Sequence, residues 1–219
     1  YSDVIVADNK IIQDHVFASY GKQAELIEYG GDHVKSRSLS KETIEKYVFT
    51  NTGYAFKVCR IEPENNIHMI LEAFSEQTKY DLVIVGNWKN SVYGLELIEK
   101  YKSFSHIHLL DPIYDQIVLN ELRSNCFLYV HGHSAGGTNP SLVEAMFLNI
   151  PIAAYDVNYN RETMENNGVG FFKNSADLKL ILQSCTKTEM EISKLKLTDV
   201  ALKRYNWQSI AQKYQAIFN

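Results

Sequence analysis

The most informative stretch of this sequence is HGHSAGGTNPSLVEAMFLNIPIAAYD, residues 131–156. Small and polar residues lead to Pro140, and the apolar segment that follows contains a single charged residue, Glu144. Asn139 is a residue type that caps helices well, and proline is favoured at the first helical position. The pattern therefore predicts a helix over residues 139–149, with a strand on either side of it.

The same alternation continues along the chain. Apolar or β-branched runs predict strands at residues 3–8, 24–29, 54–60, 81–86, 106–111, 126–132, 150–156 and 169–172. Helical patterns lie between them, at residues 64–78, 91–103, 114–124, 139–149 and 174–185. Strands that are apolar throughout and alternate with helices are typical of a parallel sheet covered on both faces. We therefore expect an α/β fold with about six parallel strands across residues 51–200.

The composition also indicates a boundary. Residues 33–50 are polar and charged with little strand character, which predicts a linker. Residues 1–32 would then form a strand-helix-strand piece of a neighbouring unit, and residues 51–200 one complete domain. The tail from Thr188 is helical to the end with a break near Asn206. The chain starts YSDVIVADNK, without a methionine, so we expect a fragment or a processed chain.

The overall composition excludes several classes of protein. Of the 219 residues, 45% are hydrophobic and 22% are charged, which is typical of a globular domain. No apolar run reaches the roughly 18 residues of a membrane span, and no signal peptide is visible. A net charge of −4 gives no basic face for nucleic acid. The three cysteines are far apart, which favours reduced thiols in the cytoplasm over disulfides or a zinc framework.

The glycines before the helix suggest a binding site. Gly136 and Gly137 would let a ligand approach the backbone closely. Free N–H groups in the first helical turn, together with the helix dipole, would hold an anion at the carboxyl edge of the sheet. A tight turn and a capped helix without a ligand fit the same pattern.

Two charged residues extend this hypothesis. Glu144 could accept hydrogen bonds from vicinal hydroxyls such as those of a ribose, or it could simply point outward from the helix. Arg60 ends a predicted strand and could form a fork onto phosphate oxygens. The alternative for Arg60 is a surface ion pair with Glu62 or Glu64.

Histidine pairs at i and i+2 could ligate a metal. His106 with His108 and His131 with His133 each share one face of a strand. No cysteine or carboxylate has a supporting spacing, so we expect no metal site. His133 is better placed to donate to a phosphate or a sugar, or to be a structural loop residue.

Three segments together resemble a known family, the family-four retaining glycosyltransferases of GT-B fold. They are KVCRIEPENNIHMILEAF, DLVIVGNWKN and GGTNPSLVEAMFLNIPIAAYD. LIEYGGD resembles the segment that closes the first domain of that family, and RYNWQSIAQKY resembles the tail that crosses back to it. The resemblance implies a Rossmann-like C-terminal half of a GT-B enzyme. Residues 1–32 would be the tail of the N-terminal acceptor domain, and residues 201–219 the crossing helix.

The resemblance also implies a function and a site. The substrate would be a nucleoside-diphosphate sugar, the acceptor a glycan or a lipid-linked molecule, and the cofactors none. Arg60 and Glu144 would be catalytic: Arg60 would neutralise diphosphate, and Glu144 would hold the ribose. Pro112 and Ile113 would meet the base. The other donor-binding residues would be Asn65, Gly86, His133, Gly136, Gly137, Thr138, Asn139, Ser141 and Leu142.

Two positions depart from the family pattern. The family commonly has an acid eight positions before Glu144 and a lysine five positions after Arg60, where this chain has Gly136 and Asn65. The remaining motifs are similar to those of bacterial rhamnosyltransferases of polysaccharide biosynthesis, which implies dTDP-rhamnose as a donor. A non-catalytic sugar-nucleotide-binding module and a nucleotide-sugar epimerase are the alternatives. Without a complete first domain, we expect no transfer by this chain alone. That missing domain would also carry any peripheral contact with the inner face of the membrane.

Overall fold

A six-stranded parallel sheet forms the centre of the molecule. The structure is a computed structural model that describes residues 3–77 and 79–218. The strands are β3 (Tyr54–Val58), β4 (Asp81–Val85), β5 (Ile107–Leu110), β6 (Leu128–His131), β7 (Ile152–Tyr155) and β8 (Gly170–Phe172). Their order is β5-β4-β3-β6-β7-β8, and every neighbouring pair is parallel. The predicted parallel sheet is confirmed.

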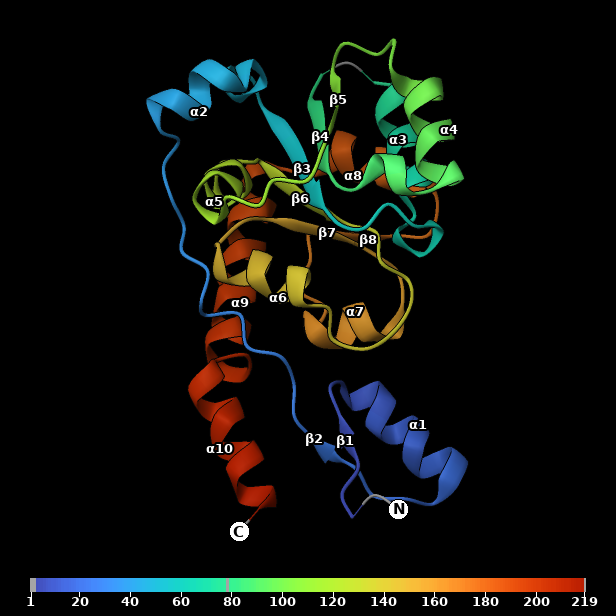
Figure 1. Cartoon of the computed structure of the whole chain (residues 1–219), viewed down its shortest axis with the longest axis vertical. Helices are drawn as coiled ribbons and strands as arrows, with labels where there is room; N and C mark the ends of the chain where they lie inside the picture. Colours follow the sequence, from blue (N-terminus) through green and yellow to red (C-terminus); the bar gives the residue numbers. More distant parts are fainter. Residues whose placement is uncertain (1–2, 78, 219) are drawn as a thin grey trace.

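Helices cover both faces of this sheet (Figure 1). The helices α3 (Ile67–Ser75), α4 (Val92–Tyr101) and α8 (Ser175–Ser184) pack on one face. The opposite face is covered by α5 (Gln116–Ser124), α6 (Pro140–Phe147) and α9 (Lys187–Arg204). Alternate strand residues such as Ala55 and Phe56 enter opposite cores, which explains why the strands are apolar throughout. The short helix α7 (Asn158–Thr163) was not predicted, because NYNRET has no helical apolar period.

The order of the strands places a crevice between β3 and β6. The chain moves outward from β3 to β5 and then returns to the other side of β3 with β6. Connections on either side of such a switch point diverge, and they leave a crevice at the carboxyl ends of the two strands. The residues after β3 and β6 therefore meet at one edge of the sheet.

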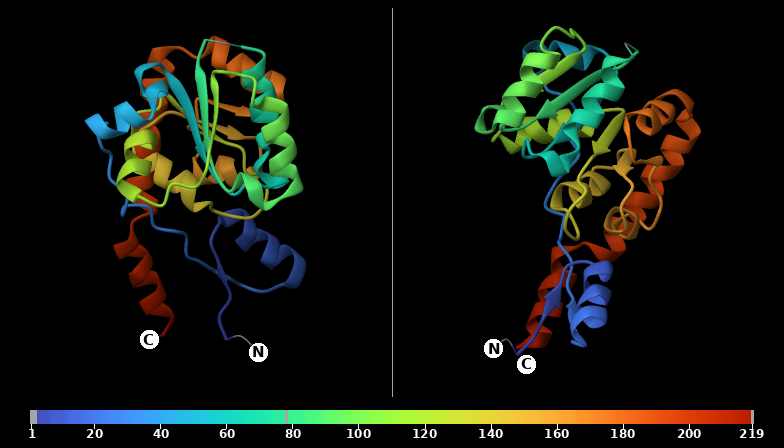
Figure 2. Two further views of the ribbon diagram at one scale, coloured as in Figure 1. Left: turned by 45° about the horizontal axis from the view of Figure 1, so that its top comes forward. Right: turned by 90° about the vertical axis from the view of Figure 1, so that its right-hand side faces the viewer.

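A smaller unit lies at the other end of the molecule (Figure 2). It contains β1 (Val6–Ala7), α1 (Lys10–Tyr20) and β2 (Glu25–Leu26), with the two strands parallel. This is the predicted strand-helix-strand piece. The expected linker at residues 33–50 contains the helix α2 (Lys41–Lys46) and the 3₁₀ turn η1 (Val48–Asn51). The side chain of Ser40 caps α2, and its hydroxyl donates to Glu121 at 2.8 Å, which anchors this segment to α5.

The last helix, α10 (Trp207–Ile217), lies beside the smaller unit (Figure 1). The chain breaks between Arg204 and Trp207, as predicted near Asn206. The last helix begins at Trp207 and not at residue 201, where the crossing helix was expected to begin, because Ala201 is still buried in the core as part of α9. Arg204 and Lys213 both pair with the buried Glu28, at 3.3 and 2.7 Å, and so attach the smaller unit.

A glycine substitution tests how closely the crevice is packed. A β-carbon on Gly132, after β6, would lie 2.2 Å from the carbonyl oxygen of Asn65. We expect Gly132→Ala to lower the free energy of unfolding by about 1–3 kcal/mol, because backbone atoms must move apart. Gly53→Ala is the matched control, since its β-carbon would meet only ordinary contacts at 3.7 Å or more. Equal stability of the two variants in urea denaturation would contradict this packing.

Candidate functional site

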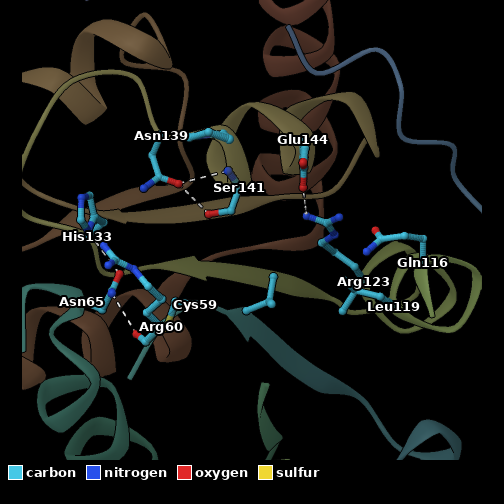
Figure 3. Close-up of a pocket in the computed structure, with 12 residues that line it drawn as sticks. Cys59, Arg60, Asn65, Gln116, Leu119, Arg123, His133, Asn139, Ser141 and Glu144 are labelled. Atoms are coloured by element: carbon cyan, nitrogen blue, oxygen red, sulfur yellow. Dashed lines mark hydrogen bonds and ion pairs between the residues drawn. The ribbon is translucent and has the colours of Figure 1, made fainter. Parts of the chain in front are cut away.

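A pocket of about 390 Å³ opens at the carboxyl edge of the sheet, in the predicted crevice (Figure 3). Segments that follow β3 and β6 form its floor, and the first turns of α5 and α6 form its walls. Six predicted residues line it: Arg60, Asn65, His133, Asn139, Ser141 and Glu144. The other lining residues are Val58, Cys59, Gln116, Leu119, Arg123 and Pro140.

Glu144 is held by a residue that the sequence analysis missed. Arg123 on α5 donates from Nη1 to Glu144 Oε2 at 2.6 Å, and from Nη2 to Asn120 at 3.2 Å. The Arg123 side chain is only 1% exposed, and its Nε has no partner within the described residues. A buried guanidinium is costly without a counter-charge, so Glu144 has a structural role as well as any binding role. The sequence feature that could have pointed to Arg123 is its place in NELRSNC, just before an apolar strand.

Arg60 is an exposed cation at the rim of the pocket. Its side chain is 71% exposed and pairs with Glu62 at 3.4 Å, the surface pair considered as the alternative. Such an exposed pair contributes about 0–1 kcal/mol, so an anion in the pocket could displace Glu62. Asn65 stabilises the backbone here, because its Nδ2 donates to the Arg60 carbonyl at 2.9 Å.

His133 is oriented by Asn65. Because Asn65 Nδ2 faces the Arg60 carbonyl, its Oδ1 is the atom 3.2 Å from His133 Nδ1, so this ring nitrogen must donate. Burial, with a smaller effect of Lys57, lowers the pKa of His133 and keeps the ring neutral at neutral pH. Its Nε2 is therefore an acceptor. An acceptor at Nε2 suits a sugar hydroxyl, and the donation from His133 to a phosphate or a sugar stays a prediction.

The first turn of α6 has fewer open amides than the sequence suggested. Asn139 Oδ1 accepts from the Ser141 N–H at 3.1 Å, and the Asn139 carbonyl accepts from Leu142 at 3.1 Å. Pro140 has no N–H. The expectation of free first-turn N–H groups is therefore wrong, because the cap satisfies them. What remains for an anion is the helix dipole and the polar side chains of Asn139 and Ser141.

The glycine loop faces the smaller unit and does not line the pocket. A β-carbon on Gly137 would lie 2.1 Å from Asp8 Oδ1, and the Thr138 hydroxyl donates to the Asp8 carbonyl at 2.5 Å. Burial raises the pKa of the Asp8 carboxyl. Gly136 has a φ of +84°, a conformation that strains other residues. An acid at this position would therefore require a different loop.

The other predicted residues lie elsewhere. Pro112 and Ile113 line a separate hollow of about 420 Å³ after β5, together with Tyr47. Gly86 allows β4 to approach the loop after β3, since its β-carbon would lie 2.5 Å from the Cys59 carbonyl oxygen. Leu142 is fully buried in the core under the sheet.

The histidine pairs do not form metal sites. Within residues 3–77 and 79–218, no group of three or more histidine, cysteine or acidic side chains is arranged to hold a metal ion. His106 contacts the Phe74 carbonyl, and His108 pairs with Asp81 at 2.8 Å. His131 is fully buried, which lowers its pKa well below the usual value and keeps it uncharged. Over the same residues, no helix is long and apolar enough to cross a membrane.

Comparison with known proteins identifies the family. The family of glycosyl transferases group 1 matches residues 40–189, which is more than half of the chain. The chain therefore belongs to this family. The match includes the pocket and the sheet edge on which it lies.

Solved structures share the fold. The chain is similar to sucrose-phosphate synthase from Thermosynechococcus elongatus, with a TM-score of 0.81 and 15% identity, over 100% of this chain and 58% of that one. It is also similar to Anabaena HepE in complex with UDP-glucose, with a TM-score of 0.83 and 16% identity, over 99% of this chain and 64% of that one. A glycosyltransferase from Rickettsia africae matches with a TM-score of 0.82 and 17% identity, over 98% of this chain and 62% of that one. These likenesses show the GT-B type of α/β fold, and the chain spans less than two thirds of each structure.

The Arg123–Glu144 pair gives a stability test. We expect Glu144→Ala to lower the free energy of unfolding by about 3 kcal/mol, because it leaves the buried guanidinium unpaired. Glu144→Gln should cost less, since the amide oxygen can still accept from Arg123. Urea denaturation checks both variants. A Glu144→Ala variant as stable as the wild type would show that Arg123 does not need this partner.

Proposed function

We propose that this chain is the donor-binding part of a retaining glycosyltransferase that uses a nucleoside-diphosphate sugar. The observation that carries the proposal is the pocket at the switch point of the sheet. It combines an exposed cation, Arg60, with a fixed carboxylate, Glu144, and the start of α6. A nucleoside diphosphate offers the complementary groups, namely negative phosphates and the hydroxyls of its pentose.

Each side chain has a role that follows from its geometry. Glu144 accepts from the pentose hydroxyls of the nucleoside with the lone pairs that Arg123 and His33 leave free. Arg60 leaves Glu62 and binds the diphosphate, where it stabilises the charge that develops on the leaving group. Asn139 and Ser141 provide polar contacts beside the α6 dipole. His133 Nε2 accepts from a hydroxyl of the donor sugar. The hollow at Pro112 and Ile113 is the proposed place for the base.

The donor we favour is dTDP-rhamnose, whose deoxyribose would offer Glu144 a single hydroxyl in place of a vicinal pair. The acceptor we favour is a glycan or a lipid-linked molecule. The rhamnosyltransferase-like motifs support this donor, and a 6-deoxy sugar has one hydroxyl fewer to be bound. Gly136 cannot take up the acid of related enzymes without strain, which agrees with a sugar that needs fewer polar contacts. The chemistry proposed needs no metal or cofactor, since the side chains and the helix dipole carry the charge stabilisation.

The Arg60 assignment has a direct binding test. We expect Arg60→Ala to weaken dTDP or UDP about tenfold while leaving the matching nucleoside nearly unchanged, because the side chain contacts phosphate only. Calorimetry measures both ligands. Lys102→Ala is the control, since Lys102 is exposed, pairs with Glu99, and lines neither the pocket nor the hollow at Pro112 and Ile113. Equal losses for nucleotide and nucleoside would refute the assignment.

Transfer tests the whole proposal. We expect this chain to bind the nucleotide but to transfer no sugar, because it spans about 60% of the structures that it matches and the acceptor would be bound by the rest. A longer chain that includes an upstream domain should transfer rhamnose from dTDP-rhamnose with retention, as judged from the anomer formed. An epimerised sugar without an acceptor product would favour an epimerase, and binding without any turnover a binding module.

A further inference from the structure

Glu144 is connected to the last helix by a chain of hydrogen bonds. Trp207 Nε1 donates to His33 Nδ1 at 3.2 Å, and His33 Nε2 lies 3.2 Å from Glu144 Oε1. An indole N–H can only donate, so His33 Nδ1 must accept. In this tautomer the ring proton is on Nε2, and the Nε2–H group donates a hydrogen bond to Glu144 Oε1. In this way Trp207 selects the tautomer of His33 that Glu144 can use.

The backbone around His33 is packed to allow these contacts. A β-carbon on Gly30 would lie 2.4 Å from the Trp207 indole, and one on Gly31 would lie 2.7 Å from Val143 on α6. The backbone N–H of Trp207 also donates to Asp32 Oδ1, at 2.9 Å. The segment 30–33 is thus held between α6, which carries Glu144, and the first turn of α10.

We propose that His33 and Trp207 are positioning residues for Glu144, and that they couple occupancy of the pocket to the docking of α10. This inference rests on the proposed function. A carboxylate has about four lone-pair directions. Arg123 takes one on Oε2 and His33 takes one on Oε1. Two directions remain, one on each oxygen, which is the number that a vicinal diol needs.

The coupling follows from the same contacts. The His33 side chain is 52% exposed, so its bond to Glu144 is one that can form and break. If the docked α10 favours the orientation of Glu144 that binds a diol, then a bound diol must favour the docked α10 by the same factor. The pocket would then respond to the position of a helix that contacts the smaller unit.

Binding measurements on the whole chain test the positioning role. We use UDP and dTDP as probes that contain a ribose or deoxyribose, and pyrophosphate as a probe without a sugar. We expect His33→Ala to weaken UDP binding about three- to tenfold, the usual effect of one hydrogen bond, and to leave pyrophosphate unchanged. The effect on dTDP should be smaller, because deoxyribose lacks the vicinal diol. His15→Ala, which changes an exposed histidine on α1 outside the pocket, is the control.

Two conservative variants separate positioning from packing. Trp207→Phe keeps an aromatic ring on Gly30 but removes the N–H, so we expect a weaker effect than His33→Ala in the same direction. His33→Gln offers an acceptor to Trp207 and a donor to Glu144, and should restore UDP binding to within about twofold of the wild type. Circular dichroism melts show whether each variant is folded.

Fluorescence tests the coupling. The chain has two tryptophans, so Trp207 is the only one in a Trp88→Phe variant. We expect UDP to change the emission of Trp207, and the change to be absent when His33→Ala is added. Failure of the wild type to bind UDP or dTDP overturns the proposed function and this inference with it. UDP binding that is unaffected by His33→Ala and Trp207→Phe, with unchanged Trp207 emission, overturns this inference alone.

Discussion

The ion pair between Arg123 and Glu144 is the interaction on which the pocket depends. A guanidinium that is only 1% exposed needs a counter-charge nearby, and Glu144 is the carboxylate that faces it, at 2.6 Å. The pair fixes the middle of α6 against the end of α5, and these two helices form the walls of the pocket. The acid proposed to hold the ribose therefore cannot be removed without affecting the fold, and for this reason loss of binding in an alanine variant is ambiguous.

Arg60 is bound weakly enough to exchange partners, because its only ion pair is exposed. Asn139 is held more firmly, since its Oδ1 accepts from the Ser141 N–H at 3.1 Å and from the Ser141 hydroxyl at 2.7 Å. Because the net charge of the chain is −4, the overall field does not attract an anion, and local groups must bind it. The site thus combines a buried ion pair and a firmly capped helix with one exposed cation, Arg60, that can turn toward a phosphate.

The sequence was sufficient for the sheet, because buried parallel strands are apolar on both faces and alternate with helical patterns along the chain. It was also sufficient for the residues that follow β3 and β6, because the strand order brings them to one edge. It was insufficient for Arg123 and His33, since their roles depend on contacts across 21 and 111 positions of the chain. The sequence analysis also overestimated the number of free N–H groups at the start of α6. Asn139 accepts from the N–H groups of Ser141 and Leu142, through its side chain and its carbonyl.

The segment from His131 to Asn139 has to serve two neighbours at once, which explains its composition. On one side His133 and Asn139 line the pocket. On the other, Gly137 and Thr138 contact the turn after β1, where Asn9 is fully buried and donates to Thr138. Gly137 has no room for a side chain, because a β-carbon there would lie 2.1 Å from Asp8 Oδ1. Gly136 is exposed, and it supplies the backbone conformation of the turn with a φ of +84°. A movement of the smaller unit would therefore displace the backbone that leads into α6, close to the proposed site of the diphosphate.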